Sequence, residues 1–479
     1  MPLPGSRMIE LAEVASGTLY GDGEVVVTDA YHDSRRLQPG SLYMAVPGLH
    51  FDGHDFAGAA VAGGALGLVV ERLLPYSVPQ IVVADTRRVM APIAVRLHGN
   101  PSRRVAVIGV TGTNGKTTVT HMLESIALAS HRTCGLIGTI ETRIGTNLIP
   151  NPHTTPEATD FQRLLRVMVD HGADLVACEV SSHSLALGRV AGTSFAVAAF
   201  TNLSQDHLDF HGSIEAYFEA KAMLFEMAVN RVIWIEDPFG ARLAGRYPEA
   251  LVVGGKGDVR AGHLIADSRG TGFTLHLPSG DVEARINIPG RFNVANALVA
   301  AACASLIGFD PGEIASGLEQ LDSVPGRFEN IAEAANFGVI VDYAHTPDGI
   351  AHVIANARSM TAGRVIAVIG AGGDRDQGKR PHMGRAGSAA DLLVVTSDNP
   401  RGENPEVIID QVMSGVATPA VLRVTDRRQA IAAALGAAAA GDIVLLLGKG
   451  HEPGQEIAGV VRPFDDRQVA RDILRELGQ

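Results

Sequence analysis

A glycine-rich segment at residues 109–118, GVTGTNGKTT, lies between an apolar run at residues 105–108 and a helical pattern at residues 117–129. In a strand–loop–helix unit, glycines let backbone N–H groups point at phosphate oxygens, and the helix N-terminus adds a favourable dipole. The spacing departs from G-x-x-x-x-G-K-[ST], because Val110 occupies the first glycine position. Its context nevertheless favours a compact phosphate-binding loop over a glycine-rich connector with a chance lysine. The segment therefore predicts an α/β nucleotide-binding unit.

This loop is predicted to bind ATP. Lys116 would reach the β- and γ-phosphates, and Thr117 would hold Mg²⁺. The other loop residues expected to contact the nucleotide are Thr111, Gly112, Thr113, Asn114, Gly115 and Thr118.

Apolar runs alternate with helical patterns along most of the chain, which predicts parallel sheets covered on both faces. A turn-rich stretch near residue 102 and a Pro-Gly turn near residue 325 divide this pattern into three α/β domains. We expect a small N-terminal α/β domain at residues 1–102, a central ATPase domain at 103–325 and a second doubly wound domain at 326–479. Further strands are expected at residues 24–28, 41–46, 65–70 and 79–84, and an antiparallel insertion at 262–288.

Charge and cysteine content narrow the class of protein. The chain of 479 residues carries a formal net charge of −12 without a basic run, which argues against a nucleic-acid surface. Three singly spaced cysteines argue against a disulfide framework or a zinc site and favour a reducing compartment. Because no segment offers about 18 uninterrupted apolar residues, we expect a cytoplasmic protein that does not enter membranes.

Carboxylate and imidazole side chains follow two predicted buried strands. Glu179 ends the apolar run at residues 175–180, and Asp206 and His207 follow the run at residues 195–200. Strand C-terminal ends face the ligand crevice in open α/β sheets, so these groups suit Mg²⁺ and developing phosphate charge. Lys221 lies in the next helical pattern. Taken singly, each histidine is more often a capping or core-edge residue.

A third group of polar loops lies late in the chain, at residues 370–380, 398–401 and 448–452. Each loop follows an apolar run, so the three should meet at one rim of the last sheet. Arginine guanidinium groups there can bind carboxylates bidentately, although solvated loop charge is an equal alternative from the residues alone.

Several motifs together resemble the Mur ligases, in chain order and over nearly the whole chain. They are TGTNGKTT at 111–118, HTTP at 153–156, EVSSH at 179–183, DHLD at 206–209, KA at 221–222, DYAHTP at 342–347, GGDRD at 372–376, DNPR at 398–401 and GKGHE at 448–452. The match is strongest to the members that add the third residue of the peptidoglycan stem peptide. This resemblance implies a uridine-binding N-terminal domain, a central ATPase and a Rossmann-like C-terminal domain that holds the incoming amino acid.

The resemblance also implies roles for individual residues. Lys116, His207 and Lys221 would be catalytic, and Mg²⁺ would be held by Thr117, Glu179, His207 and Lys221, the last carbamylated by CO₂ to N6-carboxylysine. Adenine, phosphate and ribose would be contacted by Asn293, Asn296, Arg327 and Asp342. The UDP-muramoyl-dipeptide would be held by Ser34, Leu49, His50, Phe51, His153, Thr154, Thr155, Ser181 and Arg189. The incoming amino acid would contact Arg375, Asp398, Asn399, Pro400, Arg401, Gly448 and Glu452.

The DNPR motif bears on which amino acid is added. Relatives that use meso-diaminopimelate carry this motif, whose arginine binds the distal carboxylate, and Arg401 stands at that position here. We therefore expect ATP-dependent ligation of meso-diaminopimelate to UDP-N-acetylmuramoyl-L-alanyl-D-glutamate through an acyl-phosphate, by a monomer. Two positions depart from the family pattern. Leu187 replaces a glutamine that many relatives carry, and so supplies no polar contact to the dipeptide, and Asn404 replaces the commoner aspartate after the motif.

Three alternatives stay open at this point. The first is the same reaction with L-lysine, which lacks the second carboxylate. The second is a folylpolyglutamate-synthetase-type ligase, which would lack the uridine domain and the DNPR segment. The third is a regulatory ATPase that catalyses no ligation.

Overall fold

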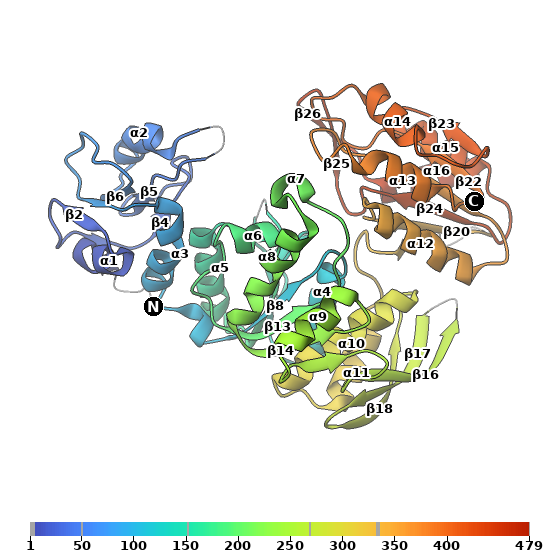
Figure 1. Ribbon diagram of the computed structural model, residues 1–479, viewed down its shortest axis with the longest axis horizontal. Helices are drawn as coiled ribbons and strands as arrows, with labels where there is room; N and C mark the ends of the chain where they lie inside the picture. Colours follow the sequence, from blue (N-terminus) through green and yellow to red (C-terminus); the bar gives the residue numbers. More distant parts are fainter. Residues whose placement is uncertain (1–4, 49–50, 151–152, 268–269, 332–335, 479) are drawn as a thin grey trace.

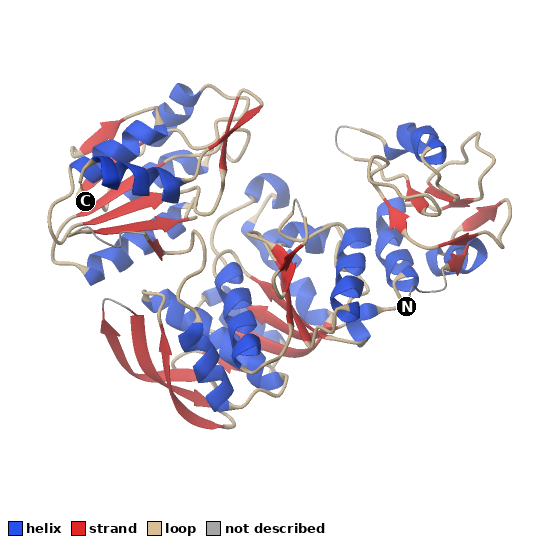
Figure 2. Ribbon diagram, turned by 180° about the vertical axis from the view of Figure 1, so that it is seen from behind, coloured by secondary structure: helices blue, strands red, loops and turns tan. Residues whose placement is uncertain are grey.

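Three α/β parts follow one another along the chain in the computed structural model, which describes residues 5–48, 51–150, 153–267, 270–331 and 336–478 (Figure 1). The N-terminal and C-terminal parts lie at opposite ends of the central part, in both views (Figures 1 and 2). Each part has its own largely parallel sheet with apolar clusters on both faces. This arrangement confirms the predicted fold class.

The N-terminal part is a five-stranded sheet in the order β2-β7-β6-β5-β4, with only β2 antiparallel to its neighbour. One face packs against α1 and α3, and the other packs against α2. The bounds are α1 Met8–Ala15, β2 Thr18–Tyr20, β4 Ala30–Tyr31, β5 Leu42–Met44, the 3₁₀ helix η1 Gly53–Phe56, α2 Ala57–Ala62, β6 Gly67–Val70, β7 Gln80–Val82, α3 Thr86–Leu97 and the 3₁₀ helix η2 Pro101–Arg103.

One predicted strand of this part is mostly absent. Residues 24–28 form only the two-residue strand β3 (Val26–Val27), which pairs with β1 (Ser6–Arg7) outside the main sheet. Val27 is buried, whereas Val26 is 47% exposed. The run therefore supplies one core side chain instead of a buried strand. The other three predicted strands form, shortened at their ends.

The central sheet has eight strands in the order β11-β10-β9-β12-β8-β13-β14-β15, parallel except for β10 and β11. Near-continuous apolar sequence in β8, β12 and β13 matches their burial on both faces. The strands are β8 Ala106–Thr111, β9 Cys134–Ile137, β10 Thr142–Ile144, β11 Asn147–Leu148, β12 Leu175–Glu179, β13 Phe195–Phe200, β14 Ala228–Trp234 and β15 Leu251–Val253.

Helices cover both faces of the central sheet. One face carries α4 Lys116–Ala129, α10 Arg291–Leu306 and α11 Pro311–Gln320, and the other carries α5 Ala158–Asp170, α6 Ser182–Ala186, α8 Ile214–Glu226 and α9 Pro238–Arg246, with α7 Leu208–His211 leading into α8. The predicted antiparallel insertion is present as β16 Arg260–Asp267, β17 Gly270–Leu277 and β18 Gly280–Ile286. Its apolar face packs into the same cluster as α10 and α11.

The C-terminal part is a six-stranded sheet in the order β19-β20-β24-β21-β22-β23, parallel except for β19. One face packs against α12, α13 and α14, and the other packs against α15 and α16. The bounds are β19 Glu329–Asn330, β20 Gly338–Asp342, α12 Pro347–Met360, β21 Val365–Ile369, α13 Lys379–Gly387, β22 Leu392–Val395, α14 Pro405–Met413, β23 Val421–Arg423, α15 Arg427–Gly436, β24 Ile443–Leu447, the hairpin β25 Gly454–Ile457 and β26 Val460–Pro463, and α16 Asp466–Glu476.

A buried ion pair joins two helices of this last part. Arg427 of α15 donates from Nε and Nη2 to the carboxylate of Asp466 at the start of α16, over 2.8 and 2.5 Å, and both side chains are fully buried. Arg427→Met would leave a buried carboxylate without its partner. We expect the free energy of unfolding to fall by about 3–5 kcal/mol, measured by urea unfolding followed by circular dichroism.

The matched control removes an exposed cation from the same part. Arg423 pairs with Glu406 and Asp410, and its side chain is 40% exposed. Arg423→Met should change the free energy of unfolding by no more than about 1 kcal/mol. Equal effects of the two substitutions would contradict a stabilising role for the buried pair.

Within the described ranges, no helix combines the length and the apolar character that crossing a bilayer requires.

Candidate functional site

The glycine-rich loop connects the end of β8 to the start of α4, as predicted. Gly112 and Gly115 have φ values of +150° and +88°. A Cβ atom at Gly112 would lie 1.9 Å from Thr201 Oγ1, and one at Gly115 would lie 2.4 Å from Asn296 Oδ1. Both positions therefore require glycine, because the backbone conformation and the close approach each exclude a side chain.

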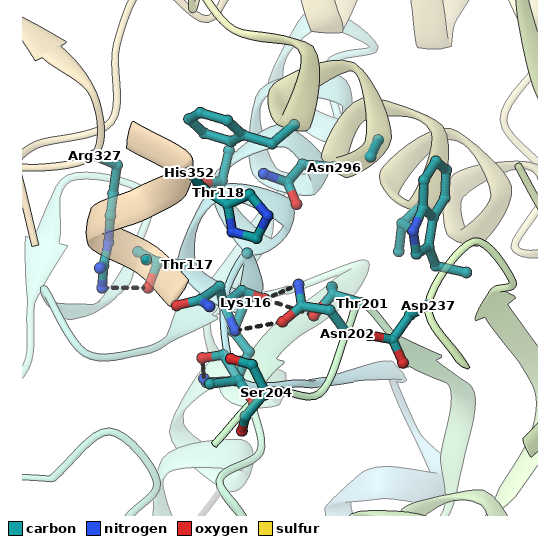
Figure 3. Close-up of a pocket in the computed structure, with 18 of the residues that line it drawn as sticks. Lys116, Thr117, Thr118, Thr201, Asn202, Ser204, Asp237, Asn296, Arg327 and His352 are labelled. Atoms are coloured by element: carbon teal, nitrogen blue, oxygen red, sulfur yellow. Dashed lines mark hydrogen bonds between the residues drawn. The ribbon is translucent and has the colours of Figure 1, made fainter. Parts of the chain in front are cut away.

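The segment after β13 fixes the conformation of the loop. Asn202 accepts hydrogen bonds from the N–H groups of Thr113 and Asn114, at 2.9 Å each, and Thr201 Oγ1 donates to the carbonyl of Asn114. Lys116 Nζ donates to the carbonyls of Gly112 and Thr113, at 2.9 and 3.0 Å. The lysine side chain thus lies across its own loop (Figure 3). Burial there lowers its pKa.

Glu179 ends β12 beside this loop and is almost fully buried. Its Oε1 accepts from Thr117 Oγ1 at 3.0 Å and from the N–H of Thr139 at 2.8 Å, while its Oε2 accepts from Thr139 Oγ1. Arg327, which precedes β20, donates from Nη2 to Thr117 Oγ1 at 3.0 Å. A residue near the start of the C-terminal part therefore touches Thr117, which follows the glycine-rich loop of the central part, as Figure 3 shows.

A second contact between the two parts involves Asp206, a buried residue after β13. Its carboxylate lies 3.6 Å from Lys379 Nζ and 3.8 Å from His345 Nε2, both in the C-terminal part. Burial opposes ionisation of Asp206, but His345, His207 and Lys379 together lower its pKa to about 2. Asp206 was singled out from the sequence because it follows a strand, but its contacts with His345, which follows β20, and with Lys379, the first residue of α13, were not predicted.

His207 and Lys221 lie near this loop. His207 has a φ of +55°, and its ring centroid lies 4.7 Å from that of His183. Burial lowers its pKa to about 4, so the imidazole is neutral and able to act as a ligand. Lys221 is buried on α8 and donates from Nζ to the carbonyl of Gly112 at 2.8 Å. In the part of the chain that the structure describes, His, Cys, Asp and Glu form no group of three or more arranged to hold a metal.

A cavity of about 870 Å³ opens over the loop, between the central and C-terminal parts. It is lined by residues 113–118, by Glu179 and His207, and by Asn296, Arg327 and Asp342. Asn296 donates to Asn293 Oδ1, and Asn293 donates to the carbonyl of Pro289. The carboxylate of Asp342 accepts the N–H groups of Phe328 and Ala344 at 2.7 Å each. The structure thus brings most of the residues predicted for the nucleotide to one cavity, whereas Thr111, Gly112 and Asn293 do not line it.

Four of the residues predicted for the muramoyl-dipeptide lie beside Glu179. Thr155 Oγ1 donates to the carbonyl of Glu179 and accepts the N–H of Ser181, and Arg189 Nη1 donates to the carbonyl of Thr155. Thr154 shares a 3.0 Å hydrogen bond with Thr139. His153 is exposed in the same segment, whereas Ser34 and the 73% exposed Phe51 lie in the N-terminal part. Leu49 and His50 lie outside the described residues.

The N-terminal part is attached to α5 by ion pairs. Arg163 of α5 donates to both oxygens of Asp29, at 2.8 and 3.0 Å, and to the carbonyl of Ala30. Arg87 of α3 pairs with Glu157, which also pairs with Arg189 at 3.0 Å. These contacts connect the N-terminal sheet to the segment that carries the predicted dipeptide-binding residues.

The residues predicted for the amino acid meet at one rim of the C-terminal sheet, after β21, β22 and β24. The N–H of Gly373 donates to the carbonyl of Asn399, and Arg401 Nη1 donates to the carbonyl of Gly373 at 2.7 Å. Asn399 Nδ2 donates to Glu452 Oε2 at 2.7 Å. Gly448 lies close to Asp398, and a Cβ atom at Gly448 would be 2.5 Å from Asp398 Oδ2. Arg375 is exposed and donates to the carbonyl of Asp374, and Pro400 lies between Asn399 and Arg401.

Comparisons with known proteins agree with this geometry. The Mur ligase family catalytic domain matches residues 28–96, the Mur ligase middle domain matches 110–304, and the Mur ligase glutamate ligase domain matches 326–450. The chain belongs to the Mur ligase family. The resemblance predicted from the motifs is therefore confirmed.

One sequence relative and two solved structures are similar to this chain. The UDP-N-acetylmuramoyl-L-alanyl-D-glutamate--2,6-diaminopimelate ligase of Geobacillus kaustophilus is 44% identical over 473 residues, 96% of each chain. A solved structure of an enzyme with the same name is 32% identical, with a TM-score of 0.69, and covers 99% of this chain and 100% of its own. Folylpolyglutamate synthase of Mycobacterium tuberculosis, complexed with ADP and AMPPCP, has a TM-score of 0.62 at 19% identity and covers 74% of this chain and 91% of its own.

Proposed function

We propose that this Mur ligase uses ATP to join meso-2,6-diaminopimelate to the free carboxylate of UDP-N-acetylmuramoyl-L-alanyl-D-glutamate. The observation that carries the proposal is the cavity over the phosphate loop, where Arg327 reaches Thr117 beside the buried Glu179. Full-length relatives that carry the name of this reaction support the choice of substrates. The cavity lies between the parts proposed to hold the carboxylate substrate and the amino acid.

The proposed chemistry has two steps. A carboxylate oxygen of the dipeptide attacks the γ-phosphorus of ATP, so that the bond to the ADP oxygen breaks and an acyl-phosphate forms. The amino nitrogen of diaminopimelate then attacks the acyl carbon, loses a proton and displaces phosphate. Lys116 and Arg327 would stabilise the negative charge that spreads over the transferring phosphoryl group. Contacts between the central and C-terminal parts would exclude water from the acyl-phosphate.

The side chains around the loop fit Mg²⁺ as the metal. Thr117 Oγ1 and Glu179 Oε1 are hard oxygen donors 3.0 Å apart beside the phosphate loop. We propose Thr117, Glu179 and His207 as ligands or near-ligands, with Lys221 contributing once its amine carries a carboxylate. When bound, the ion would neutralise charge on the phosphates.

We propose domain boundaries after residues 102 and 325. The N-terminal domain would then hold the uridine end of the substrate through Ser34 and residues 49–51. Because ATP and UDP-linked precursors are cytoplasmic metabolites, we place the reaction in the cytoplasm. A folylpolyglutamate-synthase-type function is the less favoured alternative, because that fold relative covers only 74% of this chain.

Release of ADP tests the proposed function directly. It should require both the UDP-muramoyl-dipeptide and diaminopimelate. ADP release that responds to neither cosubstrate would favour a regulatory ATPase, and release that responds to a folate with glutamate would favour the folate-type ligase.

Arg401 should determine the choice between diaminopimelate and lysine. The Arg401 side chain lies at the amino-acid rim and is 24% exposed. Its backbone φ is +51°. Arg401 Nε lies 3.6 Å from Glu456 Oε2, and a second carboxylate on the substrate would add a partner that lysine cannot supply. We therefore expect kcat/KM for meso-diaminopimelate to exceed that for L-lysine by about 10²-fold or more. Faster addition of lysine by the wild-type enzyme would contradict this assignment.

Arg401→Ala supplies the complementary measurement. It should reduce kcat/KM for diaminopimelate strongly while leaving the slow reaction with lysine nearly unchanged. Equal losses for the two amino acids would assign Arg401 to the conformation of its loop instead of to recognition.

A further inference from the structure

Lys449 lies in the loop after β24 and is fully buried at the amino-acid rim. Its Nζ donates to Asn399 Oδ1 and to Glu452 Oε2, at 3.1 Å each, and lies 3.9 Å from Asp398 Oδ1. An ammonium without solvent contact is costly unless charged and polar partners surround it. Lys449 has three such partners, and all three belong to the group predicted to hold diaminopimelate.

The contacts of Lys449 fix the orientation of the Asn399 amide. Asn399 Oδ1 accepts from Lys449 Nζ and from the N–H of Glu456 at 3.0 Å. Because the oxygen is held on that side, the amide nitrogen faces Glu452, to which it donates at 2.7 Å. Both donors converge on Glu452 Oε2, and Oε1 takes part in neither contact.

Behind Lys449, charges alternate in sign into the interior. Asp466 pairs with Arg427, whose Nη2 also donates to the carbonyl of Leu447 at the end of β24. Asp398 follows, then Lys449 and finally Glu452. The series thus contains three carboxylates and two cations. Glu452, whose side chain is 29% exposed, is the member of the series that reaches the rim.

We propose that Lys449 is a positioning residue for the amino-acid substrate, because it holds Glu452 and Asn399 so that the free carboxylate oxygen receives a substrate ammonium. This inference rests on the proposed function. A bound ammonium would extend the alternating series by one positive charge next to Glu452. Lys449 itself touches the binding residues and not the substrate.

Lys449→Met tests the inference, because methionine keeps most of the side-chain length without the charge. We expect KM for meso-diaminopimelate to rise by about 30-fold or more, with KM for ATP and for the UDP-muramoyl-dipeptide within about twofold of wild type. The rate at saturating diaminopimelate should change little, since the ammonium at Glu452 is not the reacting amine. Equal increases in all three KM values would overturn the inference, because they would indicate general damage to the fold.

A double-mutant cycle with Glu452→Gln separates positioning from stability. If Lys449 acts through Glu452, the Lys449→Met/Glu452→Gln variant should have the same KM for diaminopimelate as Glu452→Gln alone. A further rise in the double variant would overturn the inference. The double variant also removes the Glu452 carboxylate that Lys449→Met would leave without its cation, so this comparison carries the test if Lys449→Met alone does not fold.

Two controls complete the experiment. Arg364 pairs with Asp442 at the opposite rim of the same sheet, so Arg364→Met should leave KM for diaminopimelate unchanged. A wild-type enzyme without diaminopimelate-dependent ADP release would refute the proposed function. A wild-type enzyme that responds normally, together with a Lys449→Met variant of unchanged KM, would refute only the role of Lys449.

Discussion

Lys116→Ala is expected to lower the rate of ligation by about 10³-fold or more. The side chain is the cation of the phosphate loop, and it now donates to the carbonyls of Gly112 and Thr113. Burial lowers its pKa because it disfavours the charged form. Phosphate oxygens that replace those carbonyls as partners would therefore stabilise the ammonium. The measurement is ADP release with both cosubstrates at saturation, and the effect should fall mainly on kcat, because phosphoryl transfer develops charge at this point.

An exposed lysine near the same cavity provides the control. Lys256 is exposed next to Gly255, which lines the cavity. Lys256→Ala should retain activity within about twofold, as expected for a screened surface charge. Full activity of Lys116→Ala would refute the assignment of the loop, and equal losses in the two variants would point to a nonspecific effect of charge.

The buried strands were predictable because their apolar runs are continuous. Residues 175–180 and 195–200 appear in the structure as β12 and β13, within one residue of the predicted bounds. A parallel strand that is buried on both faces needs no alternation of apolar and polar residues, so its sequence is a continuous apolar run. Few other elements have such a run. The prediction for residues 24–28 was wrong because a short run with one exposed valine can pair outside the main sheet.

The site was predictable where a side chain follows a strand and not where two domains meet. Glu179 and the loop could be placed from the sequence, since strand ends share an edge. The contact of Asp206 with Lys379, and that of Thr117 with Arg327, join segments far apart in the chain. Such pairs depend on how the C-terminal part packs on the central part, and no local pattern encodes that packing. The buried Lys449 was missed although its motif was noted, because its partners Asp398 and Asn399 follow a different strand of the same sheet and the motif alone does not reveal the burial.

Lys221→Ala is expected to lower the rate of ligation by about 10²- to 10³-fold. The side chain is 1% exposed, donates from Nζ to the carbonyl of Gly112 at 2.8 Å, and lies 4.5 Å above the ring of Tyr217. Among the described residues, no carboxylate forms an ion pair with it. Burial, and then the nearby ammonium of Lys116, lower its pKa well below the usual range. The lowered pKa favours the neutral amine, which is the form that adds CO₂.

Addition of CO₂ would place a negative charge at this position. The amine nitrogen attacks the carbon of CO₂ and loses a proton, which gives a carbamate with an anionic oxygen. An ammonium there would repel Mg²⁺, whereas a carbamate oxygen would attract it. Acetate or propionate should occupy the space left by Lys221→Ala and restore part of the activity, measured by ADP release against chloride at equal ionic strength.

The pair of lysines makes this rescue specific. Lys116→Ala lacks a cation, so a carboxylate supplied in solution cannot replace the missing group and should leave that variant inactive. Recovery of both variants by acetate would indicate a general salt effect and contradict the carbamate. Recovery of Lys221→Ala alone would support a carboxylate at α8, next to the carbonyl of Gly112 where the free amine now lies.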